Sequence, residues 1–303
     1  MGRHIDSQKK NIFINKLAIG TAAFGMAYGI TNSSGTVSMR EVERILIRAY
    51  EKGVQKLDTA SAYGNAEKIL GQIGVENFHV TTKIPGPAKR GPTLRQWDPS
   101  KMLSQSLKNL KIEQCHTALL HDPSFIDSPG ASKIATQVLR LKEEGLARHV
   151  GFSSYEPAKA FEICVNLGFD AVQVPFNFLD RRASSTGLLD LARKNGIHTS
   201  VRSIFLQGLL LAEPKDLANC ERLPLQATRQ FRACCEAQCI SPEQAALSFV
   251  LQEANDSEVV VGVTSVNELE KTLEASCETK SLVWEELPPW DSAYDPRTWQ
   301  NKK

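Results

Sequence analysis

Short apolar segments alternate with amphipathic segments along most of the chain. Apolar and β-branched residues gather in eight short runs, at residues 17–20, 55–58, 79–83, 118–121, 149–153, 171–175, 198–203 and 259–262. Between these runs, apolar residues recur at intervals of three and four, which is the period of a helix with one buried face. The pattern predicts eight β-strands separated by helices.

Capping residues mark the ends of several predicted helices. Ser38 and Glu41 have the spacing of a capping box, and Gly53 follows as a stop signal, so residues 38–52 are predicted to be helical. Ser241 and Gln244 repeat the same box before a second apolar pattern. Helices therefore begin and end where the alternation with strands requires.

The regular alternation of strands and helices favours a parallel sheet, because right-handed crossovers place each helix outside the strands. We predict an α/β fold of the (β/α)8 TIM-barrel class. It would be a single domain over residues 1–303, with a core at about 15–277, a tail at 278–303 and long loops bordering the barrel mouth. A doubly wound open sheet is the alternative, but the chain reads IGTAAFGMAYG after the first strand, which is not its GxGxxG turn.

Composition narrows the class of partner. The chain has 36 basic and 34 acidic residues, so its charge gives no argument for nucleic acid or an anionic membrane. No apolar run approaches the ~20 residues that span a bilayer. The polar start MGRHIDSQKKN lacks the apolar region of a signal peptide. We expect a cytoplasmic protein that acts on a small molecule, and the sequence leaves its oligomeric state undetermined.

The seven cysteines are scattered, which fits reduced thiols better than a disulfide scaffold. Cys234, Cys235 and Cys239 form the closest cluster. No second pair or histidine follows them to complete the four nitrogen or sulfur ligands of a structural zinc site. No metal is therefore expected.

Four chemically active residues each lie at or just after the end of a predicted strand. Asp58 and Tyr63 follow the second strand in LDTASAYG, Lys83 ends the third and His121 ends the fourth. The carboxyl ends of barrel strands share one rim, so these side chains would meet there. A free tyrosine is a weak acid at neutral pH, and a lysine ammonium beside it stabilises the phenolate. With a carboxylate to keep the lysine charged and a histidine to hydrogen-bond a carbonyl oxygen, the set suits reduction of a C=O group.

Each of the four residues also has a simpler interpretation. Asp58 could cap the following turn, Tyr63 could be a loop aromatic, and His121 could be a turn residue. Lys83 could be a charge at a strand end, or a Schiff-base lysine as in barrel aldolases. Their joint placement on one rim favours the catalytic interpretation.

The motifs of the chain, taken in order, resemble those of the aldo-keto reductases. The resemblance rests on DTASAYGNAEKILG with Asp58, Tyr63 and Glu67, on TTK at Lys83, on LLH at His121, and on GFSSYEP, QVPFNFLDRR and SIFLQGLL further along. It implies a barrel that binds a nicotinamide dinucleotide at its mouth and reduces an aldehyde or ketone by hydride transfer, or catalyses the reverse oxidation. Tyr63 would be the general acid, Lys83 and Asp58 its tuning pair, and His121 the residue that orients the substrate.

The resemblance assigns a second group of residues to the cofactor. Ser153, Ser154 and Gln173 correspond to positions that hold the carboxamide, although Ser154 stands where many members carry asparagine. Simpler interpretations are that Ser153 belongs to a turn and that Gln173 fills the barrel interior. The full set of expected cofactor contacts is Thr21, Asp58, Ser153, Ser154, Gln173, Arg202, Ser203, Gly262, Thr264, Ser265 and Glu268.

The segment VGVTSVNELEKTL takes the place of the family's phosphate-binding loop and helix. Gly262 would let the backbone approach the cofactor, and Thr264 and Ser265 would hold a phosphate at the helix N-terminus. Many relatives that prefer NADPH carry arginine or lysine near Thr264, and lacking it removes a charge-assisted contact worth ~1.5–3 kcal/mol. The resemblance implies NADPH as cofactor, with NADH as the alternative. Ser265 and Glu268 could also form a plain capping box.

Arg202 is a second departure, because many relatives place an aromatic ring there to stack on the nicotinamide. A guanidinium can stack as well and adds positive charge beside the substrate, so we expect some preference for oxygen-rich or anionic carbonyl compounds. A salt bridge to a neighbouring acid is the alternative. Further open functions are a non-catalytic, cofactor-binding scaffold of the same fold, and a lyase that uses a Lys83 Schiff base.

The substrate wall is expected to come from several segments. Phe24 and Tyr28 follow the first strand, together with Met26, while Tyr63 and His121 form the reacting end. Residues 205–240 and the C-terminal tail would complete the wall. In the tail, Trp299 is expected to pack against the barrel, whereas Trp290 could either pack or cover the mouth, and Trp284 lies on the same aromatic-rich stretch.

Overall fold

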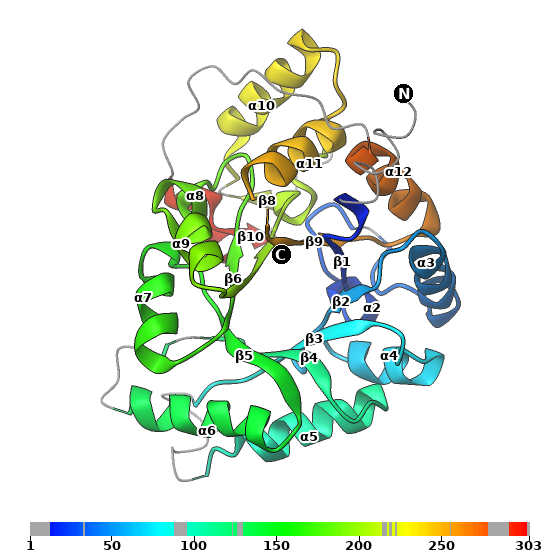
Figure 1. Ribbon diagram of the computed structural model, residues 1–303. Helices are drawn as coiled ribbons and strands as arrows, with labels where there is room; N and C mark the ends of the chain where they lie inside the picture. The colour runs from blue at the N-terminus through cyan, green and yellow to red at the C-terminus, as the bar shows by residue number, and fades with distance from the viewer. Residues whose placement is uncertain are drawn as a thin grey trace, which may run out of the picture.

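The computed structural model describes residues 13–32, 34–87, 96–122, 124–125, 130–213, 217, 220–221, 223–254, 256–277 and 291–301. Eight parallel strands close into a barrel in the order β1-β2-β3-β4-β5-β6-β7-β9, with β9 hydrogen-bonded to β1 (Figure 1). The strands are β1 (Leu17–Gly20), β2 (Lys56–Asp58), β3 (His79–Ile84), β4 (Cys115–Leu120), β5 (Ala147–Ser153), β6 (Ala171–Pro175), β7 (His198–Arg202) and β9 (Glu258–Gly262). Each strand overlaps one predicted apolar run. The TIM-barrel prediction is confirmed, and closure excludes an open doubly wound sheet.

Helices form a ring outside the barrel (Figure 1). Ser38 accepts a hydrogen bond from the Glu41 amide at 3.3 Å, and Ser241 accepts one from the Gln244 amide at 3.1 Å, which confirms both predicted N-caps. The helices are α2 (Ala22–Gly25), α3 (Met39–Glu51), α4 (Ala66–Ile73), α5 (Pro99–Leu110), α6 (Ala131–Glu143), α7 (Pro157–Leu167), α8 (Arg182–Ser185), α9 (Leu188–Lys194), α10 (Leu225–Ala237), α11 (Pro242–Glu253) and α12 (Val266–Cys277).

The hydrophobic core fills the layer between strands and helices. On α3, for example, Val42, Ile45, Leu46 and Ala49 are buried, and they recur at the predicted spacing of three and four. Strand residues such as Leu57 and Val80 meet these helical faces and are at most 1% exposed. Burial on both sides explains why the strands read as short apolar runs.

Polar side chains gather at the N-terminal end of the barrel. The rings of His79, His116, His149 and His198, from β3, β4, β5 and β7, have centroids 4.9 to 5.4 Å apart. Lys56 of β2 lies 3.6 Å from the buried carboxylate of Glu258 of β9. Each of these side chains is close to the first residue of its strand, so the cluster lies opposite the rim that carries Asp58 and Lys83.

The C-terminal segment returns to the region between β7 and α10. Two short antiparallel strands, β8 (Cys220–Glu221) and β10 (Gln300–Asn301), join these parts of the chain. Before β10 lie two 3-10 turns, η3 (Ser292–Tyr294) and η4 (Pro296–Thr298). Trp299 packs against the core and donates from Nε1 to the Ala293 carbonyl at 2.8 Å, as expected. Trp284 and Trp290 lie outside the described residues, so a lid remains a prediction.

The described residues contain neither a membrane-spanning helix nor a cluster of metal ligands. None of the helices there is long and apolar enough to cross a membrane. The same residues contain no group of three or more His, Cys, Asp or Glu side chains arranged to hold a metal ion. Cys235 is buried on α10, whereas Cys239 is exposed and follows the end of that helix, so these two thiols differ in environment.

Candidate active site

Lys83 and Asp58 form a buried ion pair at the carboxyl ends of β3 and β2. Lys83 Nζ lies 2.5 Å from Asp58 Oδ1 and also donates to the Thr59 carbonyl at 3.0 Å. Burial alone would lower the pKa of Lys83, but the charge of Asp58 and the hydrogen bond to it act against burial, and that pKa is raised above its usual value. Lys83 is therefore held as an ammonium, which is a poor nucleophile for a Schiff base.

Tyr63 and His121 lie beside this ion pair. Lys83 Nζ is 5.2 Å from the centre of the Tyr63 ring, and that ring meets the His121 ring edge to face at 5.7 Å. Burial, assisted by the positive charges of Lys83 and Arg202, lowers the pKa of His121 to about 4. The imidazole is neutral at neutral pH and can donate one hydrogen bond to a carbonyl oxygen. The structure thus brings the four predicted residues together.

Two glycines outside the predicted site determine how the Tyr63 loop packs. A Cβ atom on Gly25 would lie 1.8 Å from the Tyr63 carbonyl oxygen, and one on Gly64 would lie 2.2 Å from the Gly25 carbonyl oxygen. Gly64 also has φ +57°, in the left-handed region that glycine adopts at low cost. The backbone of Tyr63 therefore rests directly on α2. Glycine in AFG and YGN was the only sequence signal for this contact.

Gln173 connects the ion pair to the neighbouring strands. Its Nε2 donates to Asp58 Oδ2 at 2.7 Å and to Ser200 Oγ at 3.1 Å, and the residue is fully buried. Its Oε1 is buried as well and has no hydrogen-bond partner among the described residues. A buried acceptor without a partner is costly, so a ligand N–H that reached Oε1 would remove that cost. The carboxamide of a nicotinamide carries such a donor, so this site fits the cofactor.

The two serines at the end of β5 differ in their contacts. Ser153 Oγ accepts from Arg202 Nε at 3.4 Å, so it lies next to the end of β7. Ser154 Oγ accepts instead from the Glu156 amide at 2.9 Å, in the turn that leads into α7. Ser154 therefore keeps its hydroxyl hydrogen and one oxygen lone pair for another partner. Both side chains are buried at the rim.

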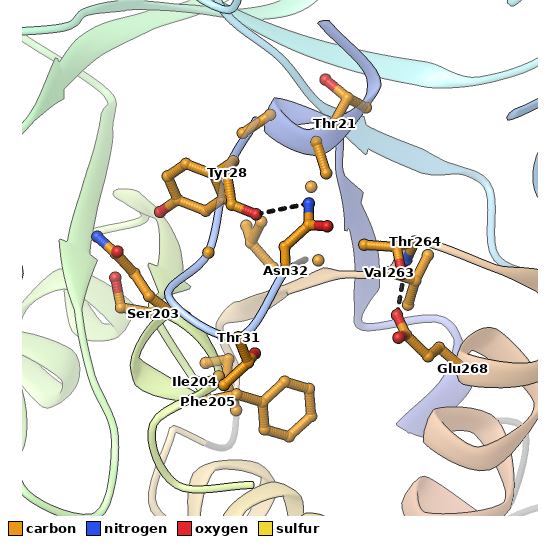
Figure 2. Close-up of a pocket in the computed structure, with 18 of the residues that line it drawn as sticks. Thr21, Tyr28, Thr31, Asn32, Ser203, Ile204, Phe205, Val263, Thr264 and Glu268 are labelled. Atoms are coloured by element: carbon orange, nitrogen blue, oxygen red, sulfur yellow. Dashed lines mark hydrogen bonds between the residues drawn. The ribbon is translucent and has the colours of Figure 1, made fainter. Parts of the chain in front are cut away.

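A cavity of about 400 Å³ opens at this rim. Its lining comes from the loop after β1, the loop after β7 and the start of α12 (Figure 2). The predicted residues that line it are Thr21, Tyr28, Asp58, Tyr63, Arg202, Ser203, Gly262, Thr264 and Glu268. Phe24, expected in the substrate wall, is instead fully buried in the core because α2 turns it inward. Ser265 lies just before the first residue of α12 and is not among the residues that line the cavity.

Two loops meet over the cavity at positions that the sequence did not single out. The Ile30 amide donates to the Gln207 carbonyl at 3.0 Å. Asn32 Nδ2 donates to the Tyr28 carbonyl at 3.1 Å, which holds the first loop in shape (Figure 2). A Cβ on Gly208 would lie 2.2 Å from the Thr31 hydroxyl. The cavity is therefore bridged by loops that are far apart in sequence.

Two carboxylates occupy the amide groups at the N-terminus of α12. Glu268 Oε2 accepts from the Thr264 amide at 2.7 Å (Figure 2), and Ser265 Oγ accepts from the Glu268 amide at 3.2 Å. Glu41 of α3 accepts from the Val266 amide at 2.9 Å. The Ser265 half of the predicted capping box is thus present, while the Glu268 carboxylate bonds the Thr264 amide and not the Ser265 amide. These contacts also place negative charge where a helix N-terminus would otherwise attract an anion.

Comparison with known proteins agrees with this geometry. The sequence model described as "Aldo/keto reductase family" matches residues 16–295. The chain is 24% identical to L-glyceraldehyde 3-phosphate reductase of Escherichia coli strain K12, over 82% of this chain and 83% of that protein. It is 25% identical to the NADH-specific methylglyoxal reductase of the same strain, over 88% of this chain and 90% of that protein.

Solved structures share the fold. The holo form of an aldo-keto reductase from Bacillus halodurans superposes with a TM-score of 0.69 at 21% identity, covering 88% of each chain. A glycerol dehydrogenase from Gluconobacter oxydans gives a TM-score of 0.67 at 22% identity, again covering 88% of each chain. At these identities the likeness concerns the barrel and not the reaction.

Proposed function

Because the chain belongs to the aldo/keto reductase family, we propose that it reduces a small aldehyde or ketone with a nicotinamide dinucleotide, with Tyr63 as the general acid. One observation carries the proposal: a buried ammonium, kept charged by Asp58, lies beside a phenol and a neutral imidazole at the mouth of the barrel. A non-catalytic scaffold would have no need for a buried charged pair next to Tyr63, because such a pair costs desolvation free energy.

The chain's own residues divide the work of the reaction. His121 donates a hydrogen bond to the substrate oxygen and orients it. Tyr63 gives its proton to that oxygen as negative charge develops there, and Lys83 stabilises the resulting phenolate. In the reverse direction Tyr63 accepts the proton. A bound nicotinamide would supply or accept the hydride, held by Gln173 and Ser153 at its carboxamide.

We further propose that the protein uses NADH in preference to NADPH, which reverses the expectation from the family resemblance. Support comes from Glu268, whose carboxylate lines the cavity at the N-terminus of α12 and already accepts the Thr264 amide. A 2′-phosphate at this end would meet a like charge in place of a cation. The ribose hydroxyl of NADH would instead find an acceptor. A relative of the chain is named for NADH specificity.

The experiment that tests the function is cofactor titration followed by turnover. Purified protein is titrated with NADH and with NADPH, while its intrinsic fluorescence is recorded, and then assayed on a panel of aldehydes and ketones. Tyr63→Phe is expected to lower kcat by about 10²–10⁴-fold while the cofactor Kd stays within threefold. Tyr50→Phe, an exposed tyrosine of α3, is the matched control and should behave as wild type.

Three results would contradict the proposal. Failure to bind either dinucleotide would remove the reductase interpretation. Binding without turnover on the whole panel would favour a non-catalytic scaffold. Full activity of Tyr63→Phe would show that another group donates the proton.

A further inference from the structure

Arg202 brings a positive charge into the cavity, and no acidic residue in the described part of the chain neutralises it. It is the one lysine or arginine among the described residues that line the cavity. Its hydrogen bonds there are to the Ser153 and Ser203 hydroxyls, both at 3.4 Å, and its guanidinium forms no ion pair with any described carboxylate. The salt bridge that the sequence left open as an alternative is thus not seen in the described part of the chain.

The guanidinium is held in place by an aromatic ring. Arg202 Cζ lies 4.0 Å from the centre of the Tyr155 ring, and Arg297 Cζ of the C-terminal segment lies 3.7 Å from the same centre. Two guanidinium groups so close to one ring centre have room only on opposite faces, so Tyr155 lies between them. Stacking fixes the plane of Arg202 while leaving most of its N–H groups free for a ligand.

The two arginines differ in charge balance. Arg297 is bound by both carboxylate oxygens of Asp295, with Nη2 2.5 Å from Oδ2, so its charge is compensated. Arg202 has no such partner among the residues that the structure describes. Of the other charged residues that line the cavity, Asp58 is paired with Lys83, and Glu268 lies at the α12 end. The reacting end of the cavity is therefore positively charged.

The backbone at this place is also unusual. Ser203, which follows Arg202 directly, has φ +62°, a left-handed conformation that costs a non-glycine residue free energy. Conformations of this kind persist where the surrounding structure imposes them, often beside a ligand site. The strain occurs where β7 ends and the chain turns into the loop that borders the cavity.

We propose that Arg202 binds an anionic group of the substrate, so that the preferred substrates are small aldehydes or ketones that carry a carboxylate or a phosphate. Guanidinium groups bind both anions through paired, charge-assisted hydrogen bonds. Tyr155 is the positioning residue that presents the guanidinium. The inference rests on the proposed reductase function, with Tyr63 and His121 facing the carbonyl oxygen while Arg202 holds the anion.

The test uses pairs of substrates that differ in one charged group. Butanal is compared with succinic semialdehyde, which carries a carboxylate, and glyceraldehyde is compared with glyceraldehyde 3-phosphate. For each pair, kcat/KM is measured for wild type, Arg202→Leu, Arg202→Lys and the control Arg297→Leu. Wild type should favour the anionic member at least tenfold. Arg202→Leu should lower that ratio at least tenfold, mainly through KM, and Arg202→Lys should restore part of it, because lysine keeps the charge but not the paired geometry.

The positioning role of Tyr155 predicts a graded result. Tyr155→Phe keeps the ring face and should keep the ratio, whereas Tyr155→Leu should lower it by a smaller factor than Arg202→Leu. Arg297→Leu should change the ratio less than threefold, since its charge is already compensated by Asp295. A ratio that falls equally in the Arg297 and Arg202 variants would show that only the fold of the C-terminal segment matters.

A binding measurement separates this inference from the proposed function. Succinate and inorganic phosphate are titrated into the protein with bound cofactor, and their Kd values are compared between wild type and Arg202→Leu. Binding that weakens at least tenfold in the variant supports the anion site even if no carbonyl compound is turned over. Equal binding of the anions to wild type and Arg202→Leu would overturn the inference. An equal loss of kcat/KM on both members of each pair, together with weaker cofactor binding, would also overturn it and would assign Arg202 to the nicotinamide.

Discussion

The substitution Lys83→Met removes the ammonium that pairs with Asp58 and that stabilises the phenolate of Tyr63. With the charge placed at the ring centre, 5.2 Å from Nζ, an effective dielectric constant of about 20 gives about 3 kcal/mol. At 1.36 kcal/mol for each factor of ten, kcat is expected to fall by about 200-fold.

The same substitution also affects stability. The Asp58 side chain is only 4% exposed, so removing Lys83 leaves a buried carboxylate without its counter-charge. Breaking a buried pair in this way costs about 3–5 kcal/mol. For a chain of this length that corresponds to a fall in Tm of about 5–8 °C. Lost activity alone could therefore reflect partial unfolding.

A double substitution separates the two effects. Lys83→Met combined with Asp58→Asn removes both charges, so it should regain most of the lost Tm without regaining the lost rate. The assays are steady-state kinetics on the best carbonyl substrate and thermal unfolding followed by circular dichroism. A double variant that recovers the wild-type rate would refute the role of Lys83 in proton transfer. A Lys83→Met protein with unchanged Tm would refute the argument from the buried pair.

Two further predictions concern the two ends of the barrel. Glu268→Gln should lower the preference for NADH over NADPH by about tenfold, because the like charge facing the 2′-phosphate is removed; Glu270→Gln on the same helix is the control, and equal effects of both would contradict the assignment. At the other end, burial and the neighbouring His149 lower the pKa of His198 from 6.5 to about 4, so the folded state favours the neutral ring. The free energy of unfolding is therefore unaffected by this group above about pH 6.5, and it falls as pH falls toward 4, because the unfolded state takes up the proton first. Relative to wild type, the free energy of unfolding of His198→Asn should rise by about 2 kcal/mol between pH 7 and pH 4, after allowance for partial exposure. Glu258 titrates in both proteins and cancels in this comparison, and a stability difference that does not change with pH would contradict the prediction.

The strands and capped helices could be predicted because their signals are local. A helical cap such as Ser38 depends on residues three positions away, and a buried strand shows as a short apolar run. Once eight strands were expected, barrel geometry placed Asp58, Lys83 and His121 on one rim without further information. The resemblance to a family then suggested their roles. Phe24 was assigned wrongly to the cavity wall, because an apolar residue after a strand suits the core equally well.

Other features depend on contacts between distant segments. The close contact of Gly25 with Gly64 joins loops that follow two different strands. The lack of a described partner for Gln173 Oε1 depends on which groups surround it in the fold. Neither can be read from neighbouring residues, since hydrogen-bond satisfaction is a property of the folded environment. The sequence therefore indicates the residue types at the site but not which of their atoms remain available to a ligand.

By itself, the sequence determined the order of strands and helices, because that order follows from local periodicity. Its motifs also placed a phenol, a lysine, a carboxylate and an imidazole at or just after strand ends. Only the tertiary structure decided the electrostatic balance of the cavity. It paired Lys83 with Asp58 and Arg297 with Asp295, brought Glu268 onto the α12 amides, and left Arg202 stacked on Tyr155 without a counter-charge from any described residue. A net field depends on distances between charges, and those distances exist only once the chain has folded.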